Sequence, residues 1–173
     1  VVDGAKVRGG CSFGPGCRLS GEIEATIFQG YSNKHHEGFL GHSFIGEWVN
    51  LGAGTINSDL KNNYRSVNVM FNGKEIDTGQ LKVGCFIGDH SKTGIGTLLP
   101  TGGIIGIFVN FFNGGPAQRF IPSFSWGNST KLVRYKLNEA IKTARIVMKR
   151  RGVILNKKTA QIIKKLYERI DRH

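Results

Sequence analysis

Between Leu81 and Val109 the hydrophobic positions of the chain recur every six residues. A period of six matches neither an amphipathic helix, whose apolar residues recur every three to four positions, nor a strand with two-residue alternation. It is typical of a short strand followed by a corner, three of which close a triangular coil that stacks on the next. The pattern therefore predicts an all-β fold, a parallel β-helix of hexapeptide repeats.

Two positions of each repeat are expected to point into the coil. The first carries a larger side chain and the fifth a small one, because the fifth lies close to a corner, and a glycine in second place tolerates positive φ. Residues in first place are Val1, Val7, Phe13, Leu19, Ile45, Leu51, Leu81, Ile87, Thr93, Leu99 and Ile105, and residues in fifth place include Cys85, Ser91, Thr97, Gly103 and Val109. Cys11 and Cys17 share the fifth place with Cys85, so we interpret all three cysteines as core filler rather than as nucleophiles, metal ligands or disulfide partners.

The six-residue pattern divides the chain into segments. We expect the β-helix over residues 1–112, with an excursion over 57–80 in which Asn72-Gly73 forms the turn of a hairpin. An irregular connector over 113–130 and a basic α-helical tail over 131–173 follow. In the tail, apolar residues recur at helical spacing from Val133, and Gly152 separates two helices. Because the chain is already in repeat register at Val1, we expect it to continue a segment that lies upstream.

Charge is concentrated in the tail. Residues 1–127 hold 10 Lys and Arg against 9 Asp and Glu, whereas residues 128–173 hold 14 against 3, so the tail carries +11 of the net charge of +12. The aromatic platforms and motifs of nucleic-acid-binding proteins are missing, so we expect no nucleic-acid partner. The tail is either a solvated helix face or an attractor for an anionic ligand such as a phosphorylated cofactor. Without a long apolar stretch or a secretory signal, the sequence predicts a cytoplasmic protein that does not enter membranes.

Two motifs resemble a known family. Residues 34–41 (Lys-His-His-Glu-Gly-Phe-Leu-Gly) and 45–55 (Ile-Gly-Glu-Trp-Val-Asn-Leu-Gly-Ala-Gly-Thr) resemble the acetyltransferase half of bifunctional N-acetylglucosamine-1-phosphate uridyltransferase/glucosamine-1-phosphate acetyltransferases. The runs 31–34, 57–62 and 122–127 resemble more closely a divergent bacterial branch of sugar-phosphate nucleotidyltransferases. The resemblance implies a left-handed β-helix, a homotrimer, a sugar phosphate acceptor and acetyl-CoA as co-substrate without a metal. It also implies an upstream nucleotidyltransferase domain.

The resemblance further implies roles for single residues. His36 matches the family's general base, Arg8 an arginine that holds the sugar phosphate, and Ala53 a residue of the acetyl-CoA groove. Around these we expect Asn33, Lys34, Phe39 and Arg65 to contact the acceptor, and Asp89, His90, Lys92 and Ile107 to contact the cofactor. The chain has Glu24, Phe39, Asp59-Leu60 and Asp89 where the family has a lysine, a tyrosine, an asparagine-tyrosine pair and a serine.

Acetyl transfer to an amine requires a base, because only the free amine attacks a thioester. Histidine, with a reference pKa of about 6.5, suits this task near neutral pH. We therefore expect His36 to be the base, Asp59 to orient its imidazole and a backbone amide near Ala53 to receive the oxyanion.

Three alternatives remain open. His35, His42 and His90 are individually explained as exposed residues without a task. Together with His36 they raise a zinc hypothesis, because γ-class carbonic anhydrases bind zinc through three histidines on the same kind of β-helix, although their last two ligands are five positions apart and His36 and His42 are six apart. The chain as a whole is either an N-acetyltransferase or a non-catalytic β-helix that trimerises a nucleotidyltransferase and binds a sugar phosphate.

Overall fold

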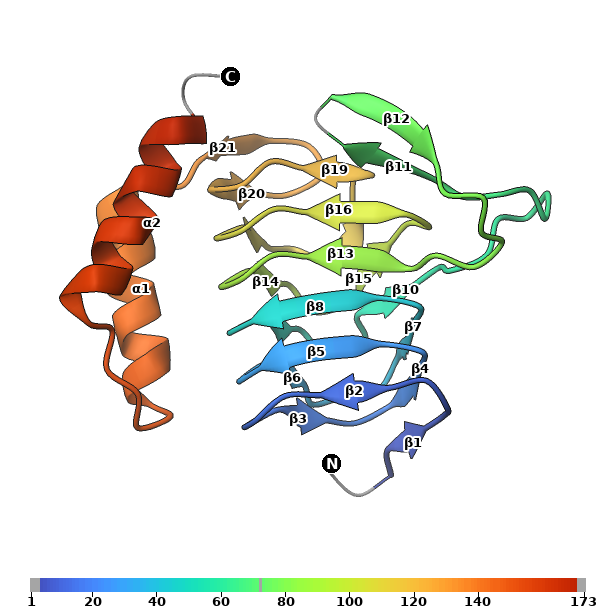
Figure 1. The fold of residues 1–173 in the computed structure, drawn as a ribbon, viewed down its shortest axis with the longest axis horizontal. Coiled ribbons are helices and arrows are strands. Elements are labelled where there is room, and N and C mark those ends of the chain that lie inside the picture. The colour runs from blue at the N-terminus through green and yellow to red at the C-terminus, as the bar shows by residue number, and fades with distance from the viewer. Residues whose placement is uncertain (1–3, 72, 171–173) are drawn as a thin grey trace.

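Stacked parallel strands form the three faces of a triangular β-helix in the computed structural model, which describes residues 4–71 and 73–170 (Figure 1). Two faces are single sheets, and the third is divided into the sheets β1-β4-β7 and β10-β15-β18. The first face contains β2 (Ser12–Phe13), β5 (Ile27–Gly30), β8 (Phe44–Glu47), β13 (Cys85–Ile87), β16 (Gly103–Ile105) and β19 (Phe120–Ile121). The second contains β3 (Arg18–Leu19), β6 (Asn33–Lys34), β9 (Asn50–Leu51), β14 (Lys92–Thr93), β17 (Asn110–Phe111) and β20 (Ser125–Gly127). The third contains β1 (Lys6–Val7), β4 (Glu22–Glu24), β7 (Phe39–Gly41), β10 (Ile56–Asn57), β15 (Thr97–Leu99) and β18 (Gly115–Pro116). The left-handed β-helix inferred from the sequence is confirmed.

Stacked inward side chains form the core of the coils. Ile23, Leu40, Ile45 and Phe111 are fully buried, and the small side chain of Cys85 lies among them. The inward places predicted from the repeat are confirmed for most of the chain, but not at Leu81, which is 55% exposed. Leu81 belongs to the end of the excursion, beside an isolated bridge between Leu60 and Lys82, and therefore lies outside the coil. Val7 is also exposed, because its strand β1 pairs with β4 alone; Val1 lies outside the described residues.

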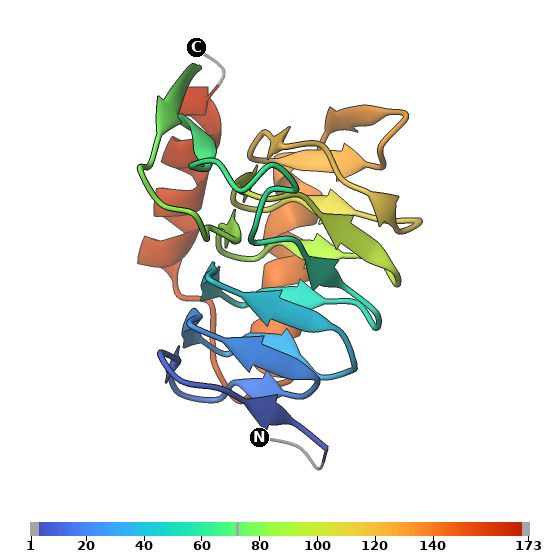
Figure 2. The ribbon, with the colours of Figure 1, turned by 90° about the vertical axis from the view of Figure 1, so that its right-hand side faces the viewer.

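The excursion contains the expected hairpin. β11 (Asn68–Phe71) and β12 (Lys74–Asp77) pair antiparallel, with Phe71 opposite Lys74. That register leaves a two-residue turn at the predicted position, where Gly73 has φ +74° and Asn72 lies outside the described residues. Figure 2 shows the hairpin standing away from the stacked coils.

The β-helix extends further than the sequence suggests. Residues 115–127, expected as an irregular connector, form β18, β19 and β20 and add one more set of stacked strands. Ile121 lies in register with Ile105, which is sixteen positions earlier in the chain. Three six-residue repeats would require eighteen positions, so the six-residue pattern does not reveal this coil. Val133, expected on a helix, lies in β21 (Leu132–Arg134), because a turn held by the Asn128 side chain reverses the chain against β20.

Two helices, α1 (Leu137–Lys149) and α2 (Lys157–Ile170), stand along the corner between the first and second faces (Figure 1). Their contact with the β-helix follows the predicted helical spacing, since α1 buries Ala140, Ala144 and Met148, each four residues apart. Gly152, with φ +72°, follows the end of α1 as expected. Neither helix, nor any other in the part of the chain that is described, is long and apolar enough to cross a membrane.

Stacked aromatic rings fill the corner beneath the helices. Tyr31, Trp48, His90, Phe108 and Phe124, here called the aromatic ladder, occupy the same corner of successive coils, all with φ between +52° and +60°. Ring centroids are 4.2 Å apart for Tyr31 and Trp48 and 4.6 Å apart for His90 and Phe108. The stacked rings therefore give the helices an apolar edge on which to pack.

His90 is the one titratable imidazole of the ladder. The ring is 8% exposed, its Nδ1 has no hydrogen-bond partner, and burial lowers the pKa of His90 from 6.5 to about 3. A folded chain therefore holds His90 neutral, whereas an unfolded chain protonates it below pH 6.5. The stability that this difference contributes is complete above pH 6.5 and is lost as the pH falls towards 3, by at most about 1.4 kcal/mol per pH unit.

We expect His90→Phe to remove this sensitivity to acid while keeping the stacked rings. Between pH 7 and pH 4.5, the free energy of unfolding in urea should fall by roughly 2 kcal/mol more for the wild type than for the variant. The exposed His35 gives the matched control, because His35→Phe should behave as the wild type does. Equal losses in wild type and His90→Phe would contradict this account of His90.

Candidate active site

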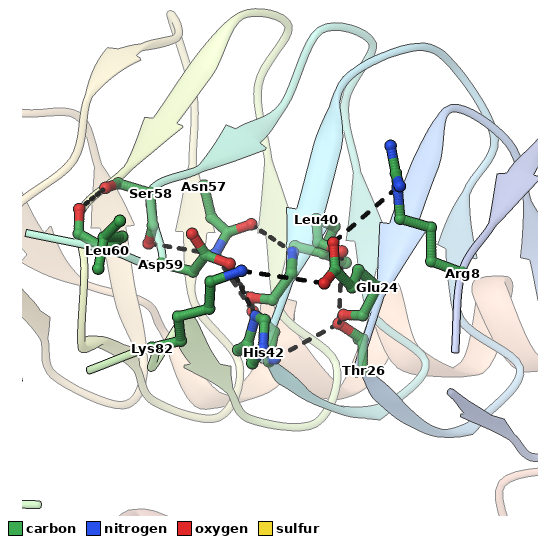
Figure 3. Close-up of polar contacts among 12 residues, drawn as sticks. Arg8, Glu24, Thr26, Leu40, His42, Asn57, Ser58, Asp59, Leu60 and Lys82 are labelled. Atoms are coloured by element: carbon green, nitrogen blue, oxygen red, sulfur yellow. Dashed lines mark hydrogen bonds and ion pairs between the residues drawn. The ribbon is translucent and has the colours of Figure 1, made fainter. Parts of the chain in front are cut away.

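A histidine and an aspartate meet at the corner between the third and first faces. His42 follows the last residue of β7, and Asp59 lies two residues beyond β10. His42 Nδ1 and Asp59 Oδ2 are 2.7 Å apart, and the side chains remain 23% and 13% exposed (Figure 3). Because a carboxylate only accepts hydrogen bonds, the pair places the proton of a neutral imidazole on Nδ1 and leaves the Nε2 lone pair as a base.

The backbone around the pair is firmly held. The Gly41 N–H donates to Asn57 Oδ1 at 2.8 Å, and Asn57 Nδ2 donates back to the Gly41 carbonyl at 2.9 Å. The His42 N–H donates to the Glu24 carbonyl, and the Val83 N–H donates to the Asp59 carbonyl. The two catalytic candidates are therefore fixed by neighbouring coils and by the returning end of the excursion.

Small residues leave room for the imidazole at this corner. The strand register places Ala25 and Gly84 directly next to His42 in the neighbouring coils, with Gly102 one coil further, so the imidazole has small neighbours on both sides. At Gly41, an added Cβ would lie 2.3 Å from Phe39 Cζ and 2.9 Å from Asp59 Oδ2. Glycine at position 41 therefore allows the Phe39 ring and the Asp59 carboxylate to lie over the backbone beside His42.

Charges of both signs surround the pair. Glu24 on β4 lies between two cations, with Arg8 Nε 3.9 Å from its Oε2 and Lys82 Nζ 3.9 Å from its Oε1 (Figure 3). Arg8 Nε also donates a hydrogen bond to Glu22 Oε1, at 2.6 Å. All of these side chains are about one third to one half exposed, so the ion pairs can rearrange around a ligand. Such a surface can accept a molecule that carries both an amine and a phosphate.

The structure brings together three of the predicted site residues, namely Arg8, Phe39 and Asp59. It pairs Asp59 with His42 and not with His36, so the expected orientation of His36 by Asp59 is not found. His36 is exposed, and its ring contacts that of His35 with centroids 5.2 Å apart. The sequence suggests for His42 either an exposed position without a task or a zinc ligand, and not a partner of Asp59. Its proximity to Asp59 arises from the stacking of coils, because the two residues are seventeen positions apart.

The remaining acceptor candidates lie elsewhere. Lys34 is 1% exposed, and its Nζ donates to the carbonyls of His36 and Glu37 at 2.5 and 2.7 Å. Burial lowers the pKa of Lys34 to about 8. Lys34 thus supports the segment that carries His36 rather than reaching into solvent. Asn33 lies on the outer side of the second face, and Arg65 is exposed in the excursion.

The cofactor candidates converge only in part: Asp89, His90 and Ile107 line one pocket beside the helices, whereas Ala53 and Lys92 lie elsewhere. Ala53 lies in the turn between β9 and β10, and its carbonyl accepts the Gly96 N–H. His90 is buried in the aromatic ladder, and Ile107 packs against the cluster beneath the helices. Asp89 accepts the Glu47 N–H at 2.8 Å, whereas Lys92 Nζ donates to the His90 carbonyl on the second face. Their contacts are mainly internal to the β-helix.

The cysteines contribute to the core, and the described residues contain no cluster of metal ligands. Burial raises the pKa of the Cys85 thiol to about 12, so it stays protonated, and Cys11 and Cys17 pack against the core as predicted. Within residues 4–71 and 73–170, no group of three or more His, Cys, Asp or Glu side chains could hold a metal ion. The zinc hypothesis therefore has no donor set in the part of the chain that is described.

The stacked coils, with most inward positions recurring every six residues, place the chain among hexapeptide-repeat β-helix proteins. Over 98 residues it is 35% identical to the bifunctional sugar-1-phosphate nucleotidylyltransferase/acetyltransferase of Sulfurisphaera tokodaii, covering 57% of this chain and 24% of that protein. It is 32% identical over 121 residues to the bifunctional protein GlmU of Synechococcus sp. strain CC9902, covering 69% of this chain and 23% of that protein. The relationship to the bifunctional nucleotidyltransferase/acetyltransferase family, inferred from the two motifs, is thereby confirmed.

The matches cover only part of each relative. The bifunctional protein GlmU of Methanocaldococcus jannaschii is 34% identical over 76 residues, which are 44% of this chain and 18% of that protein. The chain thus spans about a quarter or less of the length of these relatives. No family model matches the chain.

We expect Asn57→Ala to destabilise the site and the fold together. Asn57 is 6% exposed and bonds both the N–H and the carbonyl of Gly41; its removal takes the acceptor from the Gly41 N–H, while the carbonyl keeps the hydroxyl of Ser43 as a donor. The loss in free energy of unfolding should be roughly 1–3 kcal/mol, measured in urea. Asn50→Ala, at an exposed asparagine, is the control and should cost less than about 1 kcal/mol. A similar small loss for both variants would show that Asn57 does not hold this corner.

Proposed function

We propose that the chain is an acetyl-CoA-dependent N-acetyltransferase that acts on a hexosamine 1-phosphate in nucleotide-sugar biosynthesis. The hydrogen bond of 2.7 Å between His42 and Asp59, at an accessible corner lined by Arg8, Glu24 and Lys82, supports this function most directly. One relative is a bifunctional sugar-1-phosphate nucleotidylyltransferase/acetyltransferase, and another is a bifunctional protein GlmU. The first of these names agrees with a sugar phosphate as substrate class.

In the proposed reaction, the amine nitrogen of the sugar attacks the thioester carbonyl carbon. A C–N bond forms, the amine proton passes to His42 Nε2, the C–S bond breaks, and the coenzyme leaves as a thiol after protonation by the imidazolium. Asp59 holds the imidazole in the required tautomer and stabilises its charged form. A base positioned in this way typically accelerates proton transfer by about 10²- to 10⁴-fold.

The surrounding charges suit the acceptor. The phosphate of the sugar would bind between Arg8 and Lys82, taking the place of Glu24, which now lies 3.9 Å from each of their nitrogen atoms. The released Glu24 carboxylate is then available to the amine or to the sugar hydroxyls. Glu24 stands where the family that the sequence resembles has a lysine. We propose that Lys82 takes over the role of that lysine in binding the sugar phosphate.

Thiol release from acetyl-CoA with glucosamine 1-phosphate tests the function. We expect His42→Ala to lower kcat by about 10²- to 10⁴-fold, and Asp59→Asn, which removes the charge that orients the imidazole, to lower it by a smaller factor. His36→Ala tests the base predicted from the sequence, and His35→Ala is the matched control on an exposed histidine.

The pattern of losses separates the candidates. A loss with His42→Ala and little change with His36→Ala supports the His42–Asp59 pair, whereas the reverse assigns the base to His36. Release that requires neither histidine contradicts both. If the folded chain releases no thiol with glucosamine 1-phosphate or other amino sugar phosphates, the alternative of a non-catalytic, trimerising β-helix that binds a sugar phosphate is favoured.

We also propose that the chain acts as a cytoplasmic homotrimer without nucleic-acid or membrane partners. Outward side chains on the first face form an apolar stripe of Ile27, Phe44, Phe86, Ile104 and Phe120, which pair in register across five strands. Four of them are 37–48% exposed. Contiguous exposed patches of this kind are typical of protein interfaces.

We expect Phe86→Glu, at the centre of the stripe, to convert the trimer to a monomer in size-exclusion chromatography with light scattering at micromolar concentration. A buried carboxylate without a partner would cost several kcal/mol at each copy of the interface. Ile154→Glu is the control, since Ile154 is 83% exposed between the helices and distant from the stripe in sequence. A wild-type protein that is monomeric at this concentration would contradict the trimer.

A further inference from the structure

A basic hollow of about 350 Å³ lies between the C-terminal end of α1 and the outer side of the second face. Four cationic side chains line it, two from strands and two from the end of the helix, together with two asparagines and the rings of Tyr31 and Trp48. The cations are Arg18, Lys92, Arg150 and Arg151. In Figure 1 the end of α1 lies at the lower left, beside β3 and β6. This side of the β-helix is remote from the corner that carries His42.

The floor of the hollow is a regular cross-strand ladder. Arg18 pairs with Asn33, Asn33 with Asn50, and Asn50 with Lys92, on four adjacent parallel strands. Since neighbouring strands are about 4.8 Å apart, Arg18 and Lys92 begin about 14 Å apart, with two amides between them. Asn33 Nδ2 donates to Asn50 Oδ1 at 3.1 Å. The ladder thus presents positive charge at both ends and hydrogen-bonding groups in the middle.

The charge of the hollow is not neutralised by the protein. Within the described residues, none of the four cations forms an ion pair with a carboxylate, and no Asp or Glu lines the hollow. Lys92 Nζ donates to the His90 carbonyl, and Arg151 donates to Asn33 Oδ1 and to the Gly16 carbonyl. Burial, and then the nearby charge of Arg18, lower the pKa of Arg151. A bound anion would relieve this repulsion.

Stabilisation of α1 accounts for only half of the cluster. The C-terminal end of a helix attracts cations, which explains Arg150 and Arg151 at the end of α1. It does not explain Arg18 and Lys92, which come from β3 and β14 and face the same space. Three separate elements, β3, β14 and the end of α1, therefore contribute charge of one sign to a single hollow. Guanidinium groups are the side chains best suited to phosphate oxygens.

We propose that this hollow binds a small phosphate-bearing molecule with at least two negative charges, at a site separate from the His42–Asp59 pair. Arg18, Arg150 and Lys92 contact the phosphate oxygens, and the amides of Asn33 and Asn50 complete their hydrogen bonds. Because the hollow is on another face of the β-helix, its ligand is a second, regulatory or structural ligand rather than the acceptor of acetyl transfer.

Calorimetric titration of the whole chain with inorganic pyrophosphate tests this site, with inorganic phosphate and a nucleoside diphosphate as further arms. We expect pyrophosphate to bind at least tenfold more tightly than phosphate. Tighter binding of the nucleoside diphosphate would identify a nucleotide as the source of the phosphates. Arg18→Gln and Arg150→Gln, both at exposed side chains, should each weaken pyrophosphate binding by about tenfold or more.

Two controls make the result decisive. Arg145→Gln removes a charge from the exposed side of α1 outside the hollow, and it should leave binding within twofold of the wild type. His42→Ala should also bind pyrophosphate as the wild type does, so that failure of the acetyltransferase proposal does not decide this one. The proposal would be overturned if pyrophosphate did not bind at millimolar concentration, or if Arg145→Gln and Arg150→Gln weakened its binding equally. It would also be overturned if the hollow bound a short RNA duplex but not pyrophosphate.

Discussion

Parallel pairing between strands of successive coils holds the β-helix together and keeps the coils in register. Each strand must pair with the strand one coil away, so inward side chains such as Ile45, Ile87 and Ile105 lie directly above one another. The same register also stacks the corners. At the corners, residues with positive φ recur coil after coil, and any side chain placed there meets its counterparts at a fixed spacing. The chemistry of each corner therefore follows from which residues its column contains.

Two corners of the β-helix have opposite character for this reason. One column contains the aromatic ladder, which provides the packing surface for α1 and α2. The other contains small residues around His42, so the imidazole stands beside open space and reaches Asp59. The bulky column is covered by helices and the small column remains accessible. The candidate site thus depends on the small residues beside His42 as much as on His42 and Asp59 themselves.

The excursion completes the second corner. It leaves the coil after Asn57, places Asp59 against His42, and returns at Lys82, whose ammonium group faces Glu24. Without the excursion, the β10 strand would continue directly into the next coil, and neither Asp59 nor Lys82 would be available. The long insertion therefore supplies the acid and one cation of the candidate site, while the regular coils supply His42, Glu24 and Arg8.

The β-helix, the hairpin near Asn72-Gly73, the break at Gly152 and the packing of the cysteines against the core follow from the amino-acid sequence, because each depends on local spacing or on a single residue type. The sequence also marked Arg8 as a candidate through the resemblance to a family, and Asp59 because a catalytic imidazole needs a group that orients it. Three further features became visible only in the folded chain: Asp59 contacts His42, His90 lies in the aromatic ladder, and one more set of stacked strands follows residue 112. These outcomes depend on coil lengths of fifteen to eighteen residues, which set the residues that stack, and no six-residue count records those changes in length.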